Sequence, residues 1–214
     1  MDRLYDQIVR EHLASHLTAI REITQIQLLA LMLQERAAQL INHSALSNRV
    51  QVSLDTVLRW CDTLDAFYYC FFVRPYSRNV TRSLIKEPKV YLWDWSLAED
   101  PGARWENLVA SHLFKAVQFW NDSGRGDFAL HFLRDKEQRE VDFLVVRDRK
   151  PWFLVEVKTS DHEGLSPSLR HFQEQLKAPH AFQVIALMEY IDLDCFQERG
   201  PIKVPLATFL SQLV

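Results

Sequence analysis

Three charged residues interrupt two otherwise apolar segments in the second half of the chain. Asp142 lies in EVDFLVV, and Glu156 and Lys158 lie in WFLVEVK. Both segments are rich in β-branched and aromatic residues, which predicts two strands joined by the turn RDRKP. Glu156 and Lys158 are two residues apart, so they share one face of a strand. Carboxylates beside a lysine are the residue types that bind a divalent cation and act on a phosphate group.

The register of this hairpin decides whether the carboxylates meet. A symmetric turn centred on Arg149 places Asp142 opposite Glu156, at about 4.5–5.5 Å between Cβ atoms. Two facing carboxylates destabilise a sheet unless a cation lies between them, and Mg²⁺, or Mn²⁺ in its place, suits such a pair. We therefore expect Asp142 and Glu156 to be metal ligands and catalytic residues, with Lys158 offsetting charge on the phosphate. The alternative is a solvated hairpin in which Glu140 pairs with Lys158.

A third carboxylate precedes the strands. Apolar residues recur every three or four positions over 103–120, which predicts a helix of about five turns. Glu106 lies at the start of this helix and is expected to reach the same end of the sheet, as a direct or water-mediated metal ligand.

The pattern D-x13-E-x-K, with each half in an apolar strand, resembles the PD-(D/E)XK restriction-endonuclease-like nucleases. The resemblance covers about 101–190 and implies a divalent metal held by the aspartate and the glutamate, and cleavage of phosphodiester bonds. It also implies a supporting polar residue in the following helix, at Gln173 or Gln175. The proline that precedes the aspartate in the family pattern is replaced here by Val141.

The wider layout resembles the C-terminal half of a bacterial and archaeal group of AAA-type ATPases. There a winged helix, a strand of the type K-x-Y-x-x-D (here Lys89 to Asp94) and a nuclease-like module, domain of unknown function 4143, follow a P-loop domain. This chain has five glycines, against about 15 at average usage, and none forms a Walker A or dinucleotide-binding pattern. ATP hydrolysis is therefore not expected of this chain. The resemblance implies an ATPase partner or self-association, for a chain that is either a stand-alone remnant or a fragment of a longer ATPase.

The first part of the chain is predicted to be helical. A helix is expected over 23–41, then a short apolar piece, ALSNRV, and then a helix that begins at Ser53, followed by the β-rich run FYYCFFVRPY. This order is typical of a winged helix-turn-helix. The helix after Ser53 carries Asp55, Asp62 and Asp65 against Arg59, so the favoured interpretation is a packing module, with reading of a DNA groove as the alternative.

The predicted fold class is α/β, in two parts. Residues 1–88 form a helical, winged-helix-like region with a basic linker, and residues 89–214 form a restriction-endonuclease-like domain of the order α-β-β-β-α-β. Its further elements are strands over 128–134, 140–146, 152–158 and 182–187, a helix over 167–177, a strand over 202–204 and a short helix over 205–213.

A basic segment joins the two parts. Five cations fall within residues 74–89 against one acidic residue, in a chain of net charge −3. The segment is either a solvated linker or a strip that contacts the phosphates of a nucleic acid. The residues expected to contribute to nucleic-acid binding are Arg74, Arg78, Arg82, Lys86 and Gln173.

Two functions follow from these observations. The first is a metal-dependent protein of nuclease fold that acts on DNA. The second is a non-catalytic DNA- or protein-binding regulatory module derived from the C-terminal part of an AAA-type ATPase. Three cysteines without C-x-x-C spacing favour a reducing compartment, the cytoplasm, and the absence of long apolar runs argues against a membrane partner.

Overall fold

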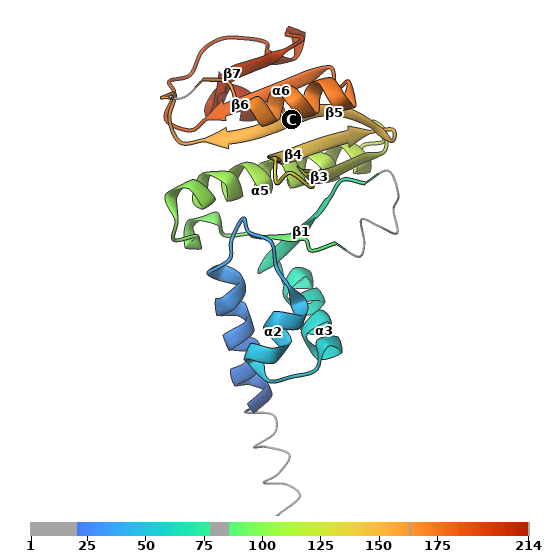
Figure 1. Ribbon diagram of the computed structural model, residues 1–214, viewed down its shortest axis with the longest axis vertical. Coiled ribbons are helices and arrows are strands. Elements are labelled where there is room, and N and C mark those ends of the chain that lie inside the picture. Colours follow the sequence, from blue (N-terminus) through green and yellow to red (C-terminus); the bar gives the residue numbers. More distant parts are fainter. Residues whose placement is uncertain (1–20, 78–85, 163, 214) are drawn as a thin grey trace, which may run out of the picture.

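The computed structural model describes residues 21–77, 86–162 and 164–213. Within these residues, seven strands form one mixed sheet in the order β2-β1-β3-β4-β5-β6-β7 (Figure 1). The central strands β3, β4 and β5 are antiparallel, whereas β1 runs parallel to β3, and β5, β6 and β7 run parallel to one another. The strands are β1 (Cys70–Pro75), β2 (Lys89–Leu92), β3 (Phe128–Arg134), β4 (Glu140–Arg147), β5 (Lys150–Lys158), β6 (His180–Ile185) and β7 (Pro201–Pro205).

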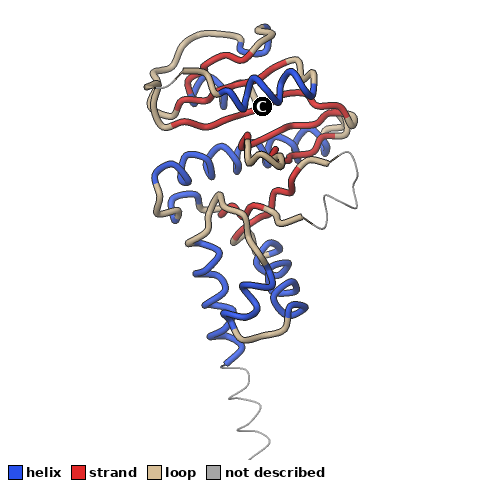
Figure 2. The backbone as a smooth tube through the Cα atoms, in the orientation of Figure 1, coloured by secondary structure: helices blue, strands red, loops and turns tan. Residues whose placement is uncertain are grey.

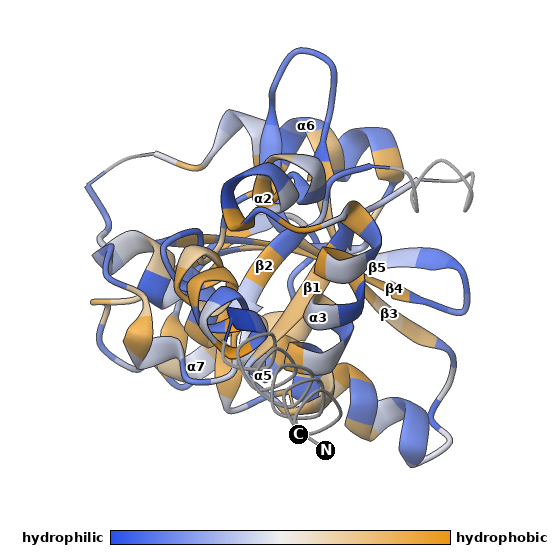
Figure 3. Cartoon of the chain, turned by 90° about the horizontal axis from the view of Figure 1, so that it is seen from below, coloured by the Kyte–Doolittle hydropathy of each residue, from blue (hydrophilic) through white to orange (hydrophobic). Residues whose placement is uncertain are grey.

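Helices cover both faces of this sheet (Figure 2). Helix α5 (Pro101–Asp122) and the short α7 (Leu206–Leu210) pack on one face, where their apolar side chains join those of the central strands in one core. Helix α6 (Pro167–Leu176) packs on the opposite face through Leu169 and Phe172. The central strands are therefore buried on both sides, and hydrophobic colouring runs along them in Figure 3.

The predicted elements of the second half are confirmed, with ends that differ by a few residues. Ser166 caps α6 by accepting a hydrogen bond from the Leu169 N–H, and Pro167 occupies the first turn, as its missing N–H allows. The expected strand over 182–187 is β6, which begins two residues earlier and ends at Ile185. The strand predicted over 202–204 is β7.

From residue 21 onward, three helical segments form the described N-terminal part, which lies below β1 in Figure 1. Residues 21–34 are helical, and α2 (His43–Val50) and α3 (Leu54–Ala66) follow. The Ser53 hydroxyl caps α3 by accepting from the Thr56 N–H, as predicted. The structure places the break predicted around Asn42 at a helix start, because the Asn42 side chain caps α2.

The helix predicted over 23–41 is too long. It ends at residue 34, and the chain then turns through Ala38, whose φ is 63°. The Ala38 N–H donates to the Val90 carbonyl, and the Ile41 N–H donates to the Pro88 carbonyl. The apolar residues of 35–41 are thus buried against β2 rather than along a helix face. The spacing of apolar residues alone does not distinguish these two kinds of burial.

The sheet continues through the boundary that the sequence suggested between residues 88 and 89. Strand β1 pairs with β2 on one side and, through Arg74 and Pro75, with β3 on the other. Residues from the N-terminal part therefore border the same sheet as the candidate site. Among the described residues, no helix is long and apolar enough to cross a membrane.

Two asparagines of α5 fasten the helix to the strands beside it. The amide of Asn107 accepts from the Leu92 N–H at 2.8 Å and donates to the Leu92 carbonyl at 2.6 Å. Asn121 makes the same pair of bonds to Phe128, at 2.7 and 2.9 Å. The two clamps differ in environment, because Asn107 is fully buried and Asn121 is exposed.

This difference gives a prediction. Asn107→Ala removes the partner of the buried Leu92 N–H and leaves the Leu92 carbonyl with only the Ser111 hydroxyl at 3.5 Å, so we expect a loss of about 2–3 kcal/mol in the free energy of unfolding. Asn121→Ala is the matched control and should cost about 1 kcal/mol or less, because water can replace the lost bonds. Chemical denaturation of both variants measures the difference, and equal losses would contradict the interpretation.

Candidate functional site

Near the site, the hairpin of β4 and β5 has the register that the sequence predicts. The turn that produces this register differs from the predicted one. The turn consists of two residues, Asp148 and Arg149, with φ values of 50° and 62°, so it is not centred on Arg149 alone. Val146 pairs with Pro151 but Val145 pairs with Phe153, so the pairing passes over Trp152. This extra residue compensates for the shorter turn.

Asp142 lies one step beyond the last regular pair, Phe143 and Val155, and Glu156 occupies the corresponding position on β5. Beyond the last regular pair, a side chain joins the two strands: Asp142 Oδ2 accepts a hydrogen bond from the Val157 N–H at 2.8 Å. Asp142 also lies in an irregular stretch of the pairing with β3, where three steps along β4 match two along β3. Such bulges redirect a side chain, and this one lies at the predicted metal ligand.

Lys89 of β2 projects into the carboxylates around Asp142. Its ammonium Nζ lies 3.0 Å from Glu106 Oε1, 2.6 Å from Glu140 Oε1 and 3.9 Å from Asp142 Oδ1. The Tyr91 hydroxyl donates to the same Glu106 oxygen at 2.8 Å. We call Lys89, Glu106, Glu140 and Asp142 the Lys89 cluster. In the sequence, Lys89 belongs to the basic segment and to the K-x-Y-x-x-D pattern, and neither feature predicts this contact.

Burial and charge oppose each other in the Lys89 cluster. Lys89 is only 3% exposed, and burial by itself would lower its pKa, but Glu106, Asp142 and Glu140 outweigh burial and raise the pKa above its usual range. Burial raises the pKa of Asp142 well above its ordinary value, and so does Glu106, whereas Lys89 and the Val157 N–H act in the opposite direction. The cluster therefore holds a permanent internal cation among like-charged carboxylates.

Glu156 is paired on one oxygen only. Lys158 Nζ lies 2.9 Å from Glu156 Oε1. Glu156 is 7% exposed, and its Oε2 is buried without a hydrogen-bond partner. An unpartnered buried carboxylate oxygen is costly, and in native proteins it usually marks a missing water or ion.

These positions partly fit a metal ion. Across the parts of the chain that the structure describes, no group of three or more His, Cys, Asp or Glu side chains could hold a metal. Mg²⁺, however, needs only one or two carboxylates, since it keeps several waters. Glu156 Oε2 lacks a partner, and Asp142 Oδ1 has Lys89 only at 3.9 Å, beyond hydrogen-bond distance. Glu106, the predicted third ligand, already accepts from Lys89 and Tyr91.

Comparison with known families divides the chain at the start of α5. Residues 101–203 match the family model of a domain of unknown function, DUF4143, and residues 1–100 match that of another, DUF8612. The chain contains a DUF4143 domain. DUF4143 is found as the C-terminal domain of AAA-ATPase family proteins, in agreement with the resemblance seen in the sequence. No curated protein and no solved structure matches.

The DUF4143 domain does not supply all residues of the candidate site. Glu106, Glu140, Asp142, Glu156 and Lys158 belong to it, whereas Lys89 and Tyr91 come from the DUF8612 segment. The site was therefore built from the two matched regions together, across the shared sheet.

Of the residues expected to bind nucleic acid, the three that the structure describes have contacts or surroundings apart from the DUF4143 carboxylates. The Gln173 side chain donates to the Ala178 carbonyl just beyond the end of α6. Arg74 and Lys86 line a separate hollow of about 370 Å³ between α2, α3 and β1. Arg78 and Arg82 lie outside the described residues.

Proposed function

We propose that this protein is a metal-dependent nuclease that acts on phosphodiester bonds of DNA through Asp142, Glu156 and Lys158. One observation carries the proposal: Glu156 keeps a buried carboxylate oxygen without a partner beside the strand position of Asp142. The pattern resembling PD-(D/E)XK nucleases and the α-β-β-β-α-β order of α5 to β6 support it.

In this proposal Asp142 and Glu156 hold Mg²⁺ or Mn²⁺. The bound cation supplies Lewis acidity and lowers the pKa of a water molecule. The Val157 N–H fixes the Asp142 carboxylate by its hydrogen bond to Oδ2, which leaves Oδ1 for a cation. Lys158 is anchored on Glu156 Oε1 and is 38% exposed, so its ammonium can meet a phosphate that arrives from solvent and offset its charge.

The second candidate function is the non-catalytic DNA- or protein-binding module, and the position of Lys89 favours it. The ammonium already neutralises part of the carboxylate charge, so a divalent cation would have to bind beside a fixed positive charge. In this interpretation the Lys89 cluster is structural and holds β2 to α5 and β4. The winged-helix interpretation of the N-terminal helices and the cytoplasmic location belong to both proposals.

Calorimetric titration of Mn²⁺ into the full chain separates the two functions. The nuclease proposal expects saturable binding at one site, weakened about tenfold by Glu156→Gln because one charged ligand is lost. Glu174→Gln, an exposed glutamate on α6, is the matched control and should leave binding unchanged.

Plasmid nicking in the same Mn²⁺ buffer is the second measurement. We expect nicking that EDTA abolishes and that Glu156→Gln strongly reduces. Saturable Mn²⁺ binding without nicking, or no binding at all, would contradict the nuclease and leave the non-catalytic module. Nicking that persists in EDTA would contradict a metal site at Glu156.

A further inference from the structure

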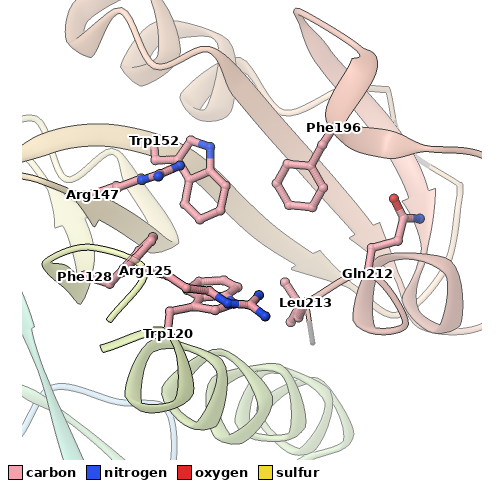
Figure 4. Close-up of a pocket in the computed structure, with 8 residues that line it drawn as sticks. All are labelled: Trp120, Arg125, Phe128, Arg147, Trp152, Phe196, Gln212 and Leu213. Atoms are coloured by element: carbon pink, nitrogen blue, oxygen red, sulfur yellow. The ribbon is translucent and has the colours of Figure 1, made fainter. Parts of the chain in front are cut away.

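A second pocket lies at the other end of the central strands. Asp142 lies near the start of β4 and Glu156 near the end of β5, whereas Arg147 ends β4 and Trp152 lies near the start of β5. The pocket has a volume of about 480 Å³, within the usual range for small-molecule sites. Its lining comes from α5, the loop after it, three strands or their ends, and the C-terminal region (Figure 4): Trp120, Arg125, Phe128, Arg147, Trp152, Phe196, Gln212 and Leu213.

Aromatic rings form the walls of this pocket. The centroids of Trp120 and Trp152 lie 5.3 Å apart, and Trp152 stacks on Phe196 at 5.7 Å with an angle of 28° between the rings. Trp152 and Phe196 are only partly buried, so part of their surface faces the pocket. These surfaces suit a planar ring, because stacking tolerates any aromatic face.

Two guanidinium groups border the same walls. Arg147 Cζ lies 5.4 Å from the ring centre of Phe128 and 5.7 Å from that of Trp152, so the aromatic rings orient it. Arg125 lies against Phe119, at 5.1 Å, and Figure 4 shows its guanidinium among the lining side chains. Both arginines are exposed.

Arg147 has a carboxylate neighbour, Asp148, at the edge of the pocket. Asp148 Oδ2 lies 3.6 Å from Arg147 Nε, which is beyond ordinary hydrogen-bond distance. Asp148 Oδ1 also accepts from the Asp127 N–H. Among the described residues that line the pocket, none is acidic. The pocket thus combines apolar ring surfaces with positive charge, and guanidinium groups can bind phosphate through paired hydrogen bonds.

We propose that this pocket binds a nucleoside monophosphate, with the base against Trp152 and Phe196 and the phosphate on Arg125 and Arg147. Such binding needs no glycine-rich loop, because side chains rather than backbone amides hold the phosphate. The site is separate from Asp142 and Glu156 and does not depend on the nuclease proposal.

Calorimetry with AMP on the full chain tests the proposal. We expect saturable binding, with adenosine and ribose 5-phosphate each about tenfold weaker, because each lacks one of the two recognised parts. Arg125→Gln and Arg147→Gln should each weaken AMP binding about fivefold or more. Arg149→Gln, an exposed turn arginine outside the pocket, is the matched control and should bind AMP as the unaltered chain does.

Three results would overturn the proposal. The first is no saturable AMP binding at millimolar concentration, which would leave the arginines as structural partners of the rings. The second is equal affinity for AMP and ribose 5-phosphate, which would mean that the aromatic rings do not bind the base. The third is an equal loss in Arg149→Gln, which would indicate attraction by general charge. Asp142→Asn should leave AMP affinity unchanged, which separates this pocket from the nuclease site.

Discussion

Replacing Lys89 with methionine is expected to lower the free energy of unfolding by about 3–5 kcal/mol at neutral pH. The ammonium is buried and contacts Glu106 and Glu140 directly, with Asp142 nearby. Methionine fills a similar volume but leaves these carboxylates in a low-dielectric space. Among the described residues, Arg134 still pairs with Glu140 at 2.9 Å. The carboxylates then repel one another without the ammonium that offsets their charge.

The pH dependence identifies the cause of this loss. In the Lys89→Met variant the pKa of Asp142 should rise further, because the cation that opposed the rise is gone. A raised folded-state pKa favours folding at low pH, and that benefit is lost as pH rises through the folded-state pKa. The deficit relative to the unaltered chain should therefore be larger at pH 8 than at pH 5. Urea denaturation at both pH values measures it, with the exposed Lys136→Met as control.

The same variant separates the two candidate functions. If Lys89 occupies the place of a metal ion, Mn²⁺ should raise the melting temperature of Lys89→Met more than that of the unaltered chain.

The pH experiment has its own contradicting outcome. A loss of unfolding free energy that is the same at pH 5 and pH 8 would contradict the role of Lys89 as a counter-ion and indicate lost packing alone.

Asp142→Asn is expected to abolish nuclease activity while stabilising the fold. The amide oxygen can still accept from the Val157 N–H, so the local geometry is retained. The negative charge that would hold a cation is lost, and we expect nicking to fall by about a hundredfold or more. Lys158→Ala should cause a similar loss of nicking, because no other charge replaces its ammonium at the phosphate.

The stability gain follows from the raised pKa of Asp142. Burial and Glu106 disfavour its charged form in the folded state. At neutral pH asparagine removes this cost, and the free energy of unfolding should rise by about 1 kcal/mol. Near pH 3 the gain should disappear, since the aspartate is then protonated in the folded chain. Nicking assays and denaturation at both pH values test the two halves, and unchanged nicking in Asp142→Asn would rule out its role as a ligand.

Local sequence determined the elements that carry the site. Runs such as EVDFLVV and WFLVEVK specify strands because their branched and aromatic side chains need burial on both faces. Ser53 and Ser166 specify helix starts through their hydroxyls. The corresponding positions of Asp142 and Glu156 on the two strands could be predicted from the same segments. The two-residue turn and the extra residue at Trp152 could not. A two-residue turn and a compensating extra residue give the same register as one symmetric turn, so the pattern could not distinguish them.

By itself, then, the sequence determined the types of chemical group and the strands and helices on which they lie, because these depend on residues within a few positions of one another. The tertiary structure alone decided how their charges are balanced. Lys89 reaches Glu140 and Asp142 only because β1 and β2 join the sheet beside β3, an arrangement set by pairing over long separations. Ion pairs leave no periodic pattern in a chain, so a buried lysine next to a basic segment looks like a solvated one until the fold encloses it.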